Sequence, residues 1–260
     1  MPSRTAGSSS ASPLRNDKNF CQVATLDRAY WILGTDNWIM TWVKICGMTN
    51  LEDALVAVDA GADAVGFVFY EKSPRCVSVE TAREIVEKLP ESVEKVGIFV
   101  NEAPERVSEM IDQAGLTAAQ LHGDEYRNAD RYLLKVRTFF SLPIAECLRG
   151  FRGSVGSSVM PTFASFAGVL LDSGTPGLRG GTGKTFAWEE ARPLVRTLTR
   201  LYPVAIAGGL TPSNVKRATE LLRPWGVDVV SGVEERPGKK DPKKVQAFVK
   251  AVREIDRKVD

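Results

Sequence analysis

Two side chains that can exchange protons with a substrate stand at the ends of short apolar runs. Cys46 ends the run WVKIC and is followed by glycine, and Asp172 ends the run FAGVLLD. If WVKIC is a strand, alternation places Lys44 on the same face as Cys46. A thiol and a carboxyl group in one site suit general acid–base catalysis, in which one group removes a proton and the other supplies one.

Cys46 and Asp172 can also each be explained by a purely structural role. A cysteine at a strand end is often only a small buried apolar side chain. Asp172 precedes the segment SGTPG and is equally suited to capping that turn. Lys44 is expected to pair with an internal carboxylate and not to react, because lysine is almost never fully buried without a partner.

Two glycine-containing segments near the C-terminus point to phosphate binding. AGGLTPSN and SGVEE each follow an apolar run. Glycine lets backbone amides approach a ligand closely, and helix N-termini favour negative charge. Each segment by itself is also explained by turn chemistry, but their occurrence after the last two apolar runs favours a phosphate site. The residues expected to form it are Gly208, Gly209, Ser231 and Gly232.

Three further polar residues follow apolar runs and could contact a substrate. Arg75, in YEKSPRCVS, carries a guanidinium fork that can bind a carboxylate with two hydrogen bonds, or it is a solvated surface side chain. Gln120 and His122, in QLHGDE, share one strand face and either hydrogen-bond a substrate or satisfy buried backbone groups. His122 is the only histidine, which excludes a multi-histidine metal site.

The segment GLRGGTGKT resembles a nucleotide-binding loop but does not have its spacing. Gly177 stands one residue too far from GKT for the phosphate-binding loop of nucleotide triphosphatases. The remaining interpretations are a mobile loop that closes over a ligand and an ordinary surface loop.

The elements that must position these residues follow a repeated pattern. From residue 42 onward, short β-branched or apolar runs alternate with longer segments of helical period, which predicts a single (β/α)8 TIM barrel of the α/β class. An open doubly wound sheet is the alternative. The weakest helix prediction follows the fifth strand, where residues 149–166 are rich in glycine and serine. The predicted strands are 42–46, 62–69, 94–100, 116–122, 142–148, 166–172, 203–209 and 227–232. The predicted helices are 51–62, 78–89, 103–115, 124–136, 186–198, 211–226 and 241–256.

The first 39 residues differ from the rest of the chain. They are rich in serine, proline and small residues and lack a periodic apolar pattern, so residues 1–39 are predicted to be a disordered extension and residues 40–260 the catalytic barrel. Met40 stands directly before the first predicted strand, so a mis-assigned start is an alternative explanation. The opening of the chain also weakly resembles a transit peptide, which would place the protein in a plastid and not in the cytoplasm.

Composition restricts the partners. The formal net charge of +2 is spread over interleaved acidic and basic residues, so no basic stripe indicates nucleic acid, and no apolar run reaches the roughly 18 residues of a membrane span. The four cysteines lie far apart and do not have the spacing of a zinc site, so they are expected to be reduced thiols in a reducing compartment such as the cytoplasm.

Seven segments, in order, resemble the phosphoribosylanthranilate isomerase family of tryptophan biosynthesis. They are KICGMT, GFVFYEKSPR, QLHGDE, LLDS, GGTGKTFAW, AIAGGLTPSNV and VDVVSGVEERPGKKD. The resemblance begins near residue 41 and reaches the C-terminus. It implies that Cys46 is the general base, that Asp172 is the general acid, and that Arg75 contacts the anthranilate carboxylate.

The resemblance also implies a reaction and its requirements. The expected activity is an Amadori rearrangement of a phosphorylated small molecule, with phosphate held by the glycine pairs, and with no metal or cofactor. A monomer or a homodimer is expected. Three alternatives stay open: the histidine-pathway sugar isomerase, whose first-strand base is a carboxylate and not a thiol; a generic aldose-phosphate isomerase; and a noncatalytic phosphosugar-binding barrel.

Overall fold

The computed structural model describes residues 40–132, 134–152, 167–174 and 185–256. The predictions for residues 1–39, for 153–166 and for nearly all of GLRGGTGKT fall outside these ranges. No helix within the described ranges is long and apolar enough to cross a membrane.

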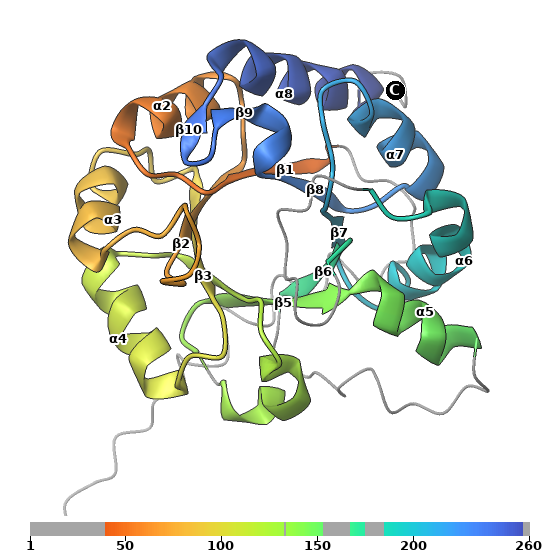
Figure 1. Cartoon of the computed structure of the whole chain (residues 1–260), viewed down its shortest axis with the longest axis horizontal. Helices are drawn as coiled ribbons and strands as arrows, with labels where there is room; N and C mark the ends of the chain where they lie inside the picture. Colours follow the sequence, from red (N-terminus) through yellow and green to blue (C-terminus); the bar gives the residue numbers. More distant parts are fainter. Residues whose placement is uncertain (1–39, 133, 153–166, 175–184, 257–260) are drawn as a thin grey trace, which may run out of the picture. The chain divides into compact units, whose positions relative to one another are not determined.

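Eight parallel strands close into a barrel in the order of the sequence (Figure 1). The first strand pairs with both the second and the eighth, so the sheet has no free edge. The predicted (β/α)8 barrel is therefore confirmed, and the open doubly wound sheet is wrong. The strands are β1 Trp42–Cys46, β2 Ala64–Val68, β3 Glu94–Phe99, β4 Ala118–Leu121, β5 Arg137–Pro143, β6 Gly168–Asp172, β7 Val204–Ile206 and β8 Gly226–Val229.

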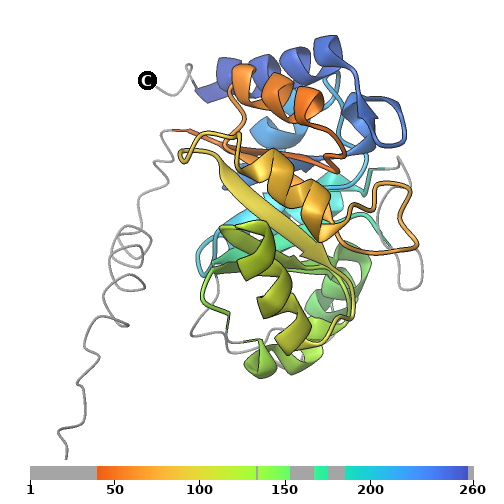
Figure 2. The same ribbon diagram turned by 90° about the vertical axis from the view of Figure 1, so that its left-hand side faces the viewer.

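Helices surround the barrel, and Figure 2 shows two of them, α3 and α4, lying across the outer face of the sheet. Two of the helices begin with a side-chain cap: before α2 the Asn50 side chain accepts a hydrogen bond from the Asp53 N–H, and before α3 the Ser78 side chain accepts one from the Thr81 N–H. The helices are α2 Leu51–Asp59, α3 Val79–Val86, α4 Pro104–Ala114, α5 Ile144–Arg152, α6 Trp188–Leu198, α7 Val215–Leu222 and α8 Pro242–Asp256.

The alternation expected for the first strand is present in β1. Val43 and Ile45 are fully buried and belong to the continuous apolar core of the domain. Lys44 and Cys46 are also buried but do not belong to that apolar cluster. They face the barrel interior, so the polar groups of β1 converge on the barrel axis.

The prediction for the fifth strand was wrong in its position. The strand is residues 137–143, and the segment predicted as a strand, residues 142–148, is mostly the start of α5. Ile144 and Cys147 are both buried, at the spacing of three that a helix requires. The helix predicted over residues 124–136 is also wrong, since the chain forms a 3-10 helix, η1 Glu125–Arg131, interrupted at Asn128.

An additional hairpin follows the last barrel strand. After β8 comes a single 3-10 turn, η2 Ser231–Val233, and then the antiparallel strands β9 Glu234–Arg236 and β10 Lys239–Lys240. The turn between them contains Pro237 and Gly238, and Gly238 has a φ of +82°, a conformation that favours glycine. The hairpin places two charged side chains, Glu234 and Lys240, inside the protein.

Candidate active site

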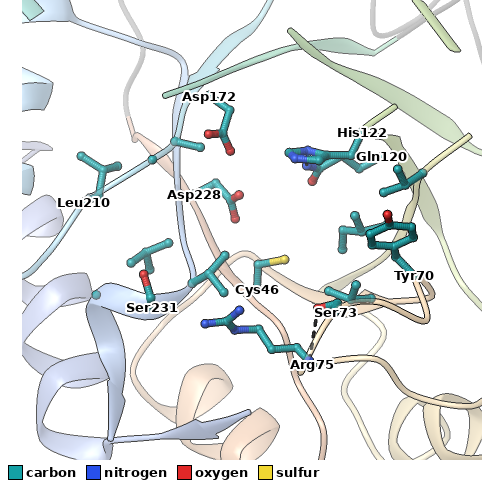
Figure 3. Close-up of a pocket in the computed structure, with 18 of the residues that line it drawn as sticks. Cys46, Tyr70, Ser73, Arg75, Gln120, His122, Asp172, Leu210, Asp228 and Ser231 are labelled. Carbon is teal, nitrogen blue, oxygen red and sulfur yellow. Dashed lines mark hydrogen bonds between the residues drawn. The ribbon is translucent and has the colours of Figure 1, made fainter. Parts of the chain in front are cut away.

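A cavity of about 290 Å³ opens at the carboxyl ends of the strands (Figure 3). The nine residues that the sequence predicts to act in catalysis or substrate binding all line it, although they come from the ends of six different strands and the loops that follow them. The barrel brings them together because parallel strands present their carboxyl ends at one face. The nine are Cys46, Arg75, Gln120, His122, Asp172, Gly208, Gly209, Ser231 and Gly232.

Cys46 is 4 % exposed and lies against a glycine of the neighbouring strand. A Cβ atom on Gly66 would lie 2.6 Å from the Cys46 sulfur, so only glycine leaves room for the thiol there. Burial raises the pKa of the thiol, while the charges of Lys44 and Lys240 act in the opposite direction. The resting side chain is therefore a neutral thiol whose ionised form would have cationic neighbours.

A polar network fills the barrel interior below Cys46. The Lys44 ammonium donates hydrogen bonds of 2.7 Å each to Asp228 Oδ1 and Gln120 Oε1. Lys44 and Asp228 are register partners across β1 and β8, so the last strand supplies the carboxylate expected for this lysine. Burial works to lower the pKa of Lys44, but the charges of and hydrogen bonds with Asp228 and Cys46 together raise it overall. Lys44 therefore keeps its ammonium form in the buried interior.

Gln120 and His122 are held within this network. The Gln120 amide donates to Ser141 Oγ at 2.9 Å, and its nitrogen lies 3.4 Å from His122 Nδ1. Both side chains reach the cavity wall from the end of β4. The sequence left open whether Gln120 faces a substrate or satisfies buried polar groups. In the structure it hydrogen-bonds buried side chains and also lines the cavity.

Asp172 ends β6 and is 9 % exposed. Its Oδ1 accepts a hydrogen bond of 2.7 Å from the Gly174 N–H, so it does cap the following turn. Its other oxygen has no hydrogen-bond partner among the residues the structure describes. Figure 3 shows the Asp172 carboxylate and the Cys46 thiol directed toward one space, from β6 and β1. The turn bond therefore orients the carboxylate without occupying both of its oxygens.

The loops after β7 and β8 lie against each other. A Cβ atom on Gly232 would lie 1.8 Å from the Leu210 carbonyl oxygen, so a larger residue would push the two loops apart. Gly208 and Gly209 have φ values of +87° and +65°. The backbone N–H groups of Gly209 and Gly232 have no acceptor within the described ranges, and these glycines line the cavity. The loops therefore offer backbone donors to an anion.

Arg75 is largely buried and not a solvated surface side chain. Its Nε and Nη2 donate to the two carboxylate oxygens of Glu234 at 2.8 and 2.7 Å, and its side chain is 12 % exposed. Burial works to raise the pKa of Glu234, but Arg75 and Lys240 lower it overall. Nη1 has no hydrogen bond to the described residues, so one edge of the guanidinium is available to a ligand in the cavity.

Three buried charged residues beside the cavity, Asp228, Glu234 and Lys240, were not singled out in the sequence. Asp228 was visible as a polar residue inside the apolar run VDVV, in register to meet the lysine of the first strand. Glu234 and Lys240 flank RPGK, whose Pro-Gly pair indicates a hairpin turn. No group of three or more histidine, cysteine, aspartate or glutamate side chains within the described ranges is arranged to hold a metal ion.

Comparisons with known proteins agree with one another. Residues 43–251 match the family PRAI, described as N-(5′-phosphoribosyl)anthranilate (PRA) isomerase. A protein of that name from Chlorobaculum parvum is 45 % identical over 223 residues, which is 84 % of this chain and 97 % of the relative.

Two solved structures resemble the fold and cover 83 % of this chain and 100 % of theirs. One is described as a monomer generated from the dimeric phosphoribosylanthranilate isomerase of Thermotoga maritima, with a TM-score of 0.66 and 38 % identity. The other is a phosphoribosylanthranilate isomerase in complex with reduced 1-(o-carboxyphenylamino)-1-deoxyribulose 5-phosphate, with a TM-score of 0.67 and 38 % identity.

Proposed function

The chain belongs to the N-(5′-phosphoribosyl)anthranilate isomerase family, and from this premise we propose how its own residues perform the reaction. The protein converts N-(5′-phosphoribosyl)anthranilate to 1-(o-carboxyphenylamino)-1-deoxyribulose 5-phosphate in tryptophan biosynthesis. The observation that carries the residue assignment is that Cys46 and Asp172 face one cavity that the paired glycine loops also line.

Asp172 acts first, as the general acid. In its protonated form it gives a proton to the furanose ring oxygen, the C1–O bond breaks, and the nitrogen lone pair forms an iminium at C1. The bond from Gly174 to Oδ1 keeps the carboxyl group in one orientation and leaves Oδ2 to carry the proton toward the cavity. Glycines after β7 keep the neighbouring turn close without a side chain in the path.

Cys46 acts second, as the general base. The iminium acidifies the proton on C2, the thiolate removes it, and the electron pair forms the C1–C2 double bond of an enolamine. The enolamine then gains a proton at C1 and loses the proton of the C2 hydroxyl, which gives the ketone. The reaction consists of a ring opening and proton transfers, with no external electron donor or acceptor, so we assign no metal and no cofactor to it.

The substrate's two anionic ends fix its direction in the cavity. The backbone donors of Gly209 and Gly232 suit the phosphate, and Arg75 suits the anthranilate carboxylate through Nη1. Gln120 and His122 line the cavity from the end of β4.

The assignment is tested by following the loss of anthranilate-type fluorescence when freshly made substrate is added. Cys46→Ser and Asp172→Asn are each expected to lower kcat by at least ~10²-fold, the scale of a lost general acid or base. Both variants should keep the rise in melting temperature that a phosphorylated product analogue gives. Cys76→Ser is the matched control, because that thiol is exposed and does not line the cavity. Near-normal turnover of either catalytic variant would reject its role.

The alternatives make different predictions in the same assay. The histidine-pathway isomerase has a carboxylate where this chain has Cys46, and a noncatalytic binding barrel would retain phosphate affinity without turnover.

We propose that the protein is a monomer or a homodimer in the cytoplasm. The plastid alternative rests on residues 1–39, which are not described, and the relatives named above come from bacteria and give it no support.

A further inference from the structure

A buried ion cluster joins the loop after β2 to the hairpin β9–β10. Glu234 accepts two hydrogen bonds from Arg75 and one of 3.1 Å from the Lys240 ammonium. The Lys240 side chain is 0 % exposed and that of Glu234 is 4 % exposed. The cluster contains two basic side chains and one carboxylate, so basic groups outnumber acidic ones beside the cavity. Burial lowers the pKa of Lys240, while the Glu234 carboxylate acts to keep the ammonium charged.

The remaining bonds of Lys240 go to the backbone of the active site. Its Nζ lies 2.6 Å from the carbonyl oxygen of Cys46 and 3.3 Å from that of Val230, the residue before Ser231. An ammonium group has three donors, and these two carbonyls and Glu234 account for all three. Lys240 therefore ties the end of β1 to the loop after β8.

Stability alone does not explain this arrangement. Desolvating a lysine completely is costly, and replacing buried ion pairs by apolar residues is often neutral or stabilising. A hairpin that serves only to cover the barrel could do so with apolar side chains. The two carbonyls that Lys240 contacts instead belong to the segments that carry the thiol and the anion-binding loop.

We propose that Lys240 is a positioning residue, which fixes the main chain of Cys46 and supplies the uncompensated positive charge that favours the thiolate over the thiol. The inference rests on the proposed role of Cys46 as the base. The charged groups around the thiol come from five elements: Lys44 of β1, Asp228 of β8, Arg75 after β2, Lys240 of β10 and Asp172 of β6, whose carboxylate faces the same space.

The charges of these groups do not contribute equally. Lys44 is compensated by Asp228 at 2.7 Å, so that pair is close to neutral as seen from the cavity. Glu234 is shared between Arg75 and Lys240, so it compensates only one of them. Neutralising Lys240 would therefore remove the excess positive charge of its cluster, and the thiolate would become less stable.

The test measures ionisation of the thiol without substrate. Iodoacetamide reacts with the thiolate, so the rate of Cys46 alkylation against pH, followed residue by residue with mass spectrometry, reports the thiolate fraction. Lys240→Met is expected to slow alkylation near neutral pH about tenfold, which corresponds to a midpoint one pH unit higher. Lys240→Arg should stay within about threefold of the wild type. Cys76, an exposed thiol of the same chain, serves as the internal standard.

Lys239→Met is the matched control. Lys239 precedes Lys240 in β10, and its side chain pairs with the exposed Glu52 and with the buried Asp53, which also accepts a hydrogen bond from the Lys240 N–H. Its loss removes the same formal charge without removing a bond to the Cys46 carbonyl. Its alkylation profile should match the wild type. Lys240→Gln is the second neutral variant, because its amide can still donate to a carbonyl. It should show the same slowing, and both neutral variants should lower kcat more than they raise KM.

The alkylation rate of Cys46 and the folding of the two neutral variants decide whether Lys240 is a positioning residue. Unchanged alkylation of Cys46 in a folded neutral variant would overturn the proposal. Failure of both neutral variants to fold, judged by circular dichroism, would also overturn it in favour of a purely structural lysine. Slowed alkylation in a protein whose Cys46→Ser variant still turns over substrate would support the positioning role and reject the proposed base.

Discussion

Gly66 gives the sharpest test of how tightly Cys46 is placed. The change is Gly66→Ala, which adds one methyl group on β2. That carbon would lie 2.6 Å from the Cys46 sulfur and 2.9 Å from Ile98 Cδ1, whereas ordinary contacts begin near ~3.5 Å. The thiol must therefore move by about 1 Å or rotate to another rotamer. Misplacing a reacting group by that much costs ~10²-fold in rate.

The expected result is a kcat about 10²-fold below that of the wild type, equivalent to about 2.7 kcal/mol of transition-state stabilisation. KM should change little, because the added methyl group contacts neither Arg75 nor the glycine loops. The overpacked methyl group should also lower the free energy of unfolding by about 1–3 kcal/mol. Turnover is measured by loss of substrate fluorescence, and stability by urea denaturation.

Gly97→Ala is the control on the adjacent strand β3. Its methyl carbon would lie 2.7 Å from Leu116 Cδ1 and 2.8 Å from the Phe99 ring, so the crowding is similar, but those neighbours belong to the apolar core and not to the cavity wall. It should lose stability and keep kcat. A Gly66→Ala enzyme with kcat within about threefold of the control would refute the claim that Gly66 is required for the position of the thiol.

Two further predictions concern the base and the phosphate loops. Because burial raises the pKa of Cys46, the thiolate is the minor form at neutral pH, and kcat/KM should rise with pH to at least the ordinary thiol pKa of about 8.5. Cys46→Ser should abolish this rise. A pH profile of kcat/KM that is flat from pH 7 to 9 would contradict the prediction. Gly232→Ala places a carbon 1.8 Å from the Leu210 carbonyl oxygen and should raise KM at least ~10-fold, because it separates the loops after β7 and β8. Gly168→Ala is the control: its carbon would lie 2.7 Å from the Pro203 carbonyl oxygen, outside the cavity, and KM should not change.

The sequence predicted the barrel because most of its strands and helices have clear periodic patterns. The fifth strand failed for a physical reason: a short apolar run such as LPIAECL fits a buried strand and a buried helix turn equally well. The spacing of Ile144 and Cys147 was compatible with a helix from the start. The true strand, RTFFSLP, has β-branched and aromatic residues at its centre, which was the stronger strand signal.

The candidate site was predictable to the extent that it depends on strand ends. Cys46 and Asp172 could be placed because the barrel rule assigns function to the carboxyl ends of strands, without knowledge of contacts. The partners of these residues could not be placed in the same way. Glu234 and Lys240 lie in a hairpin whose direction relative to the barrel depends on tertiary packing, which no local pattern in EERPGKK encodes.

Because β1 pairs with β8, the active site is completed only after nearly the whole chain has been synthesised. Lys44 and Asp228 are 184 positions apart, and Cys46 and Lys240 are 194 apart. At typical translation speeds a nascent chain carries Cys46 without Lys240 for roughly 10–40 s. Loops of that length close late, because their entropy is lost before their contacts form. On the ribosome, Cys46 therefore stays uncovered until the last strand docks, and the fall in its alkylation rate to that of the folded protein marks the moment at which the barrel closes.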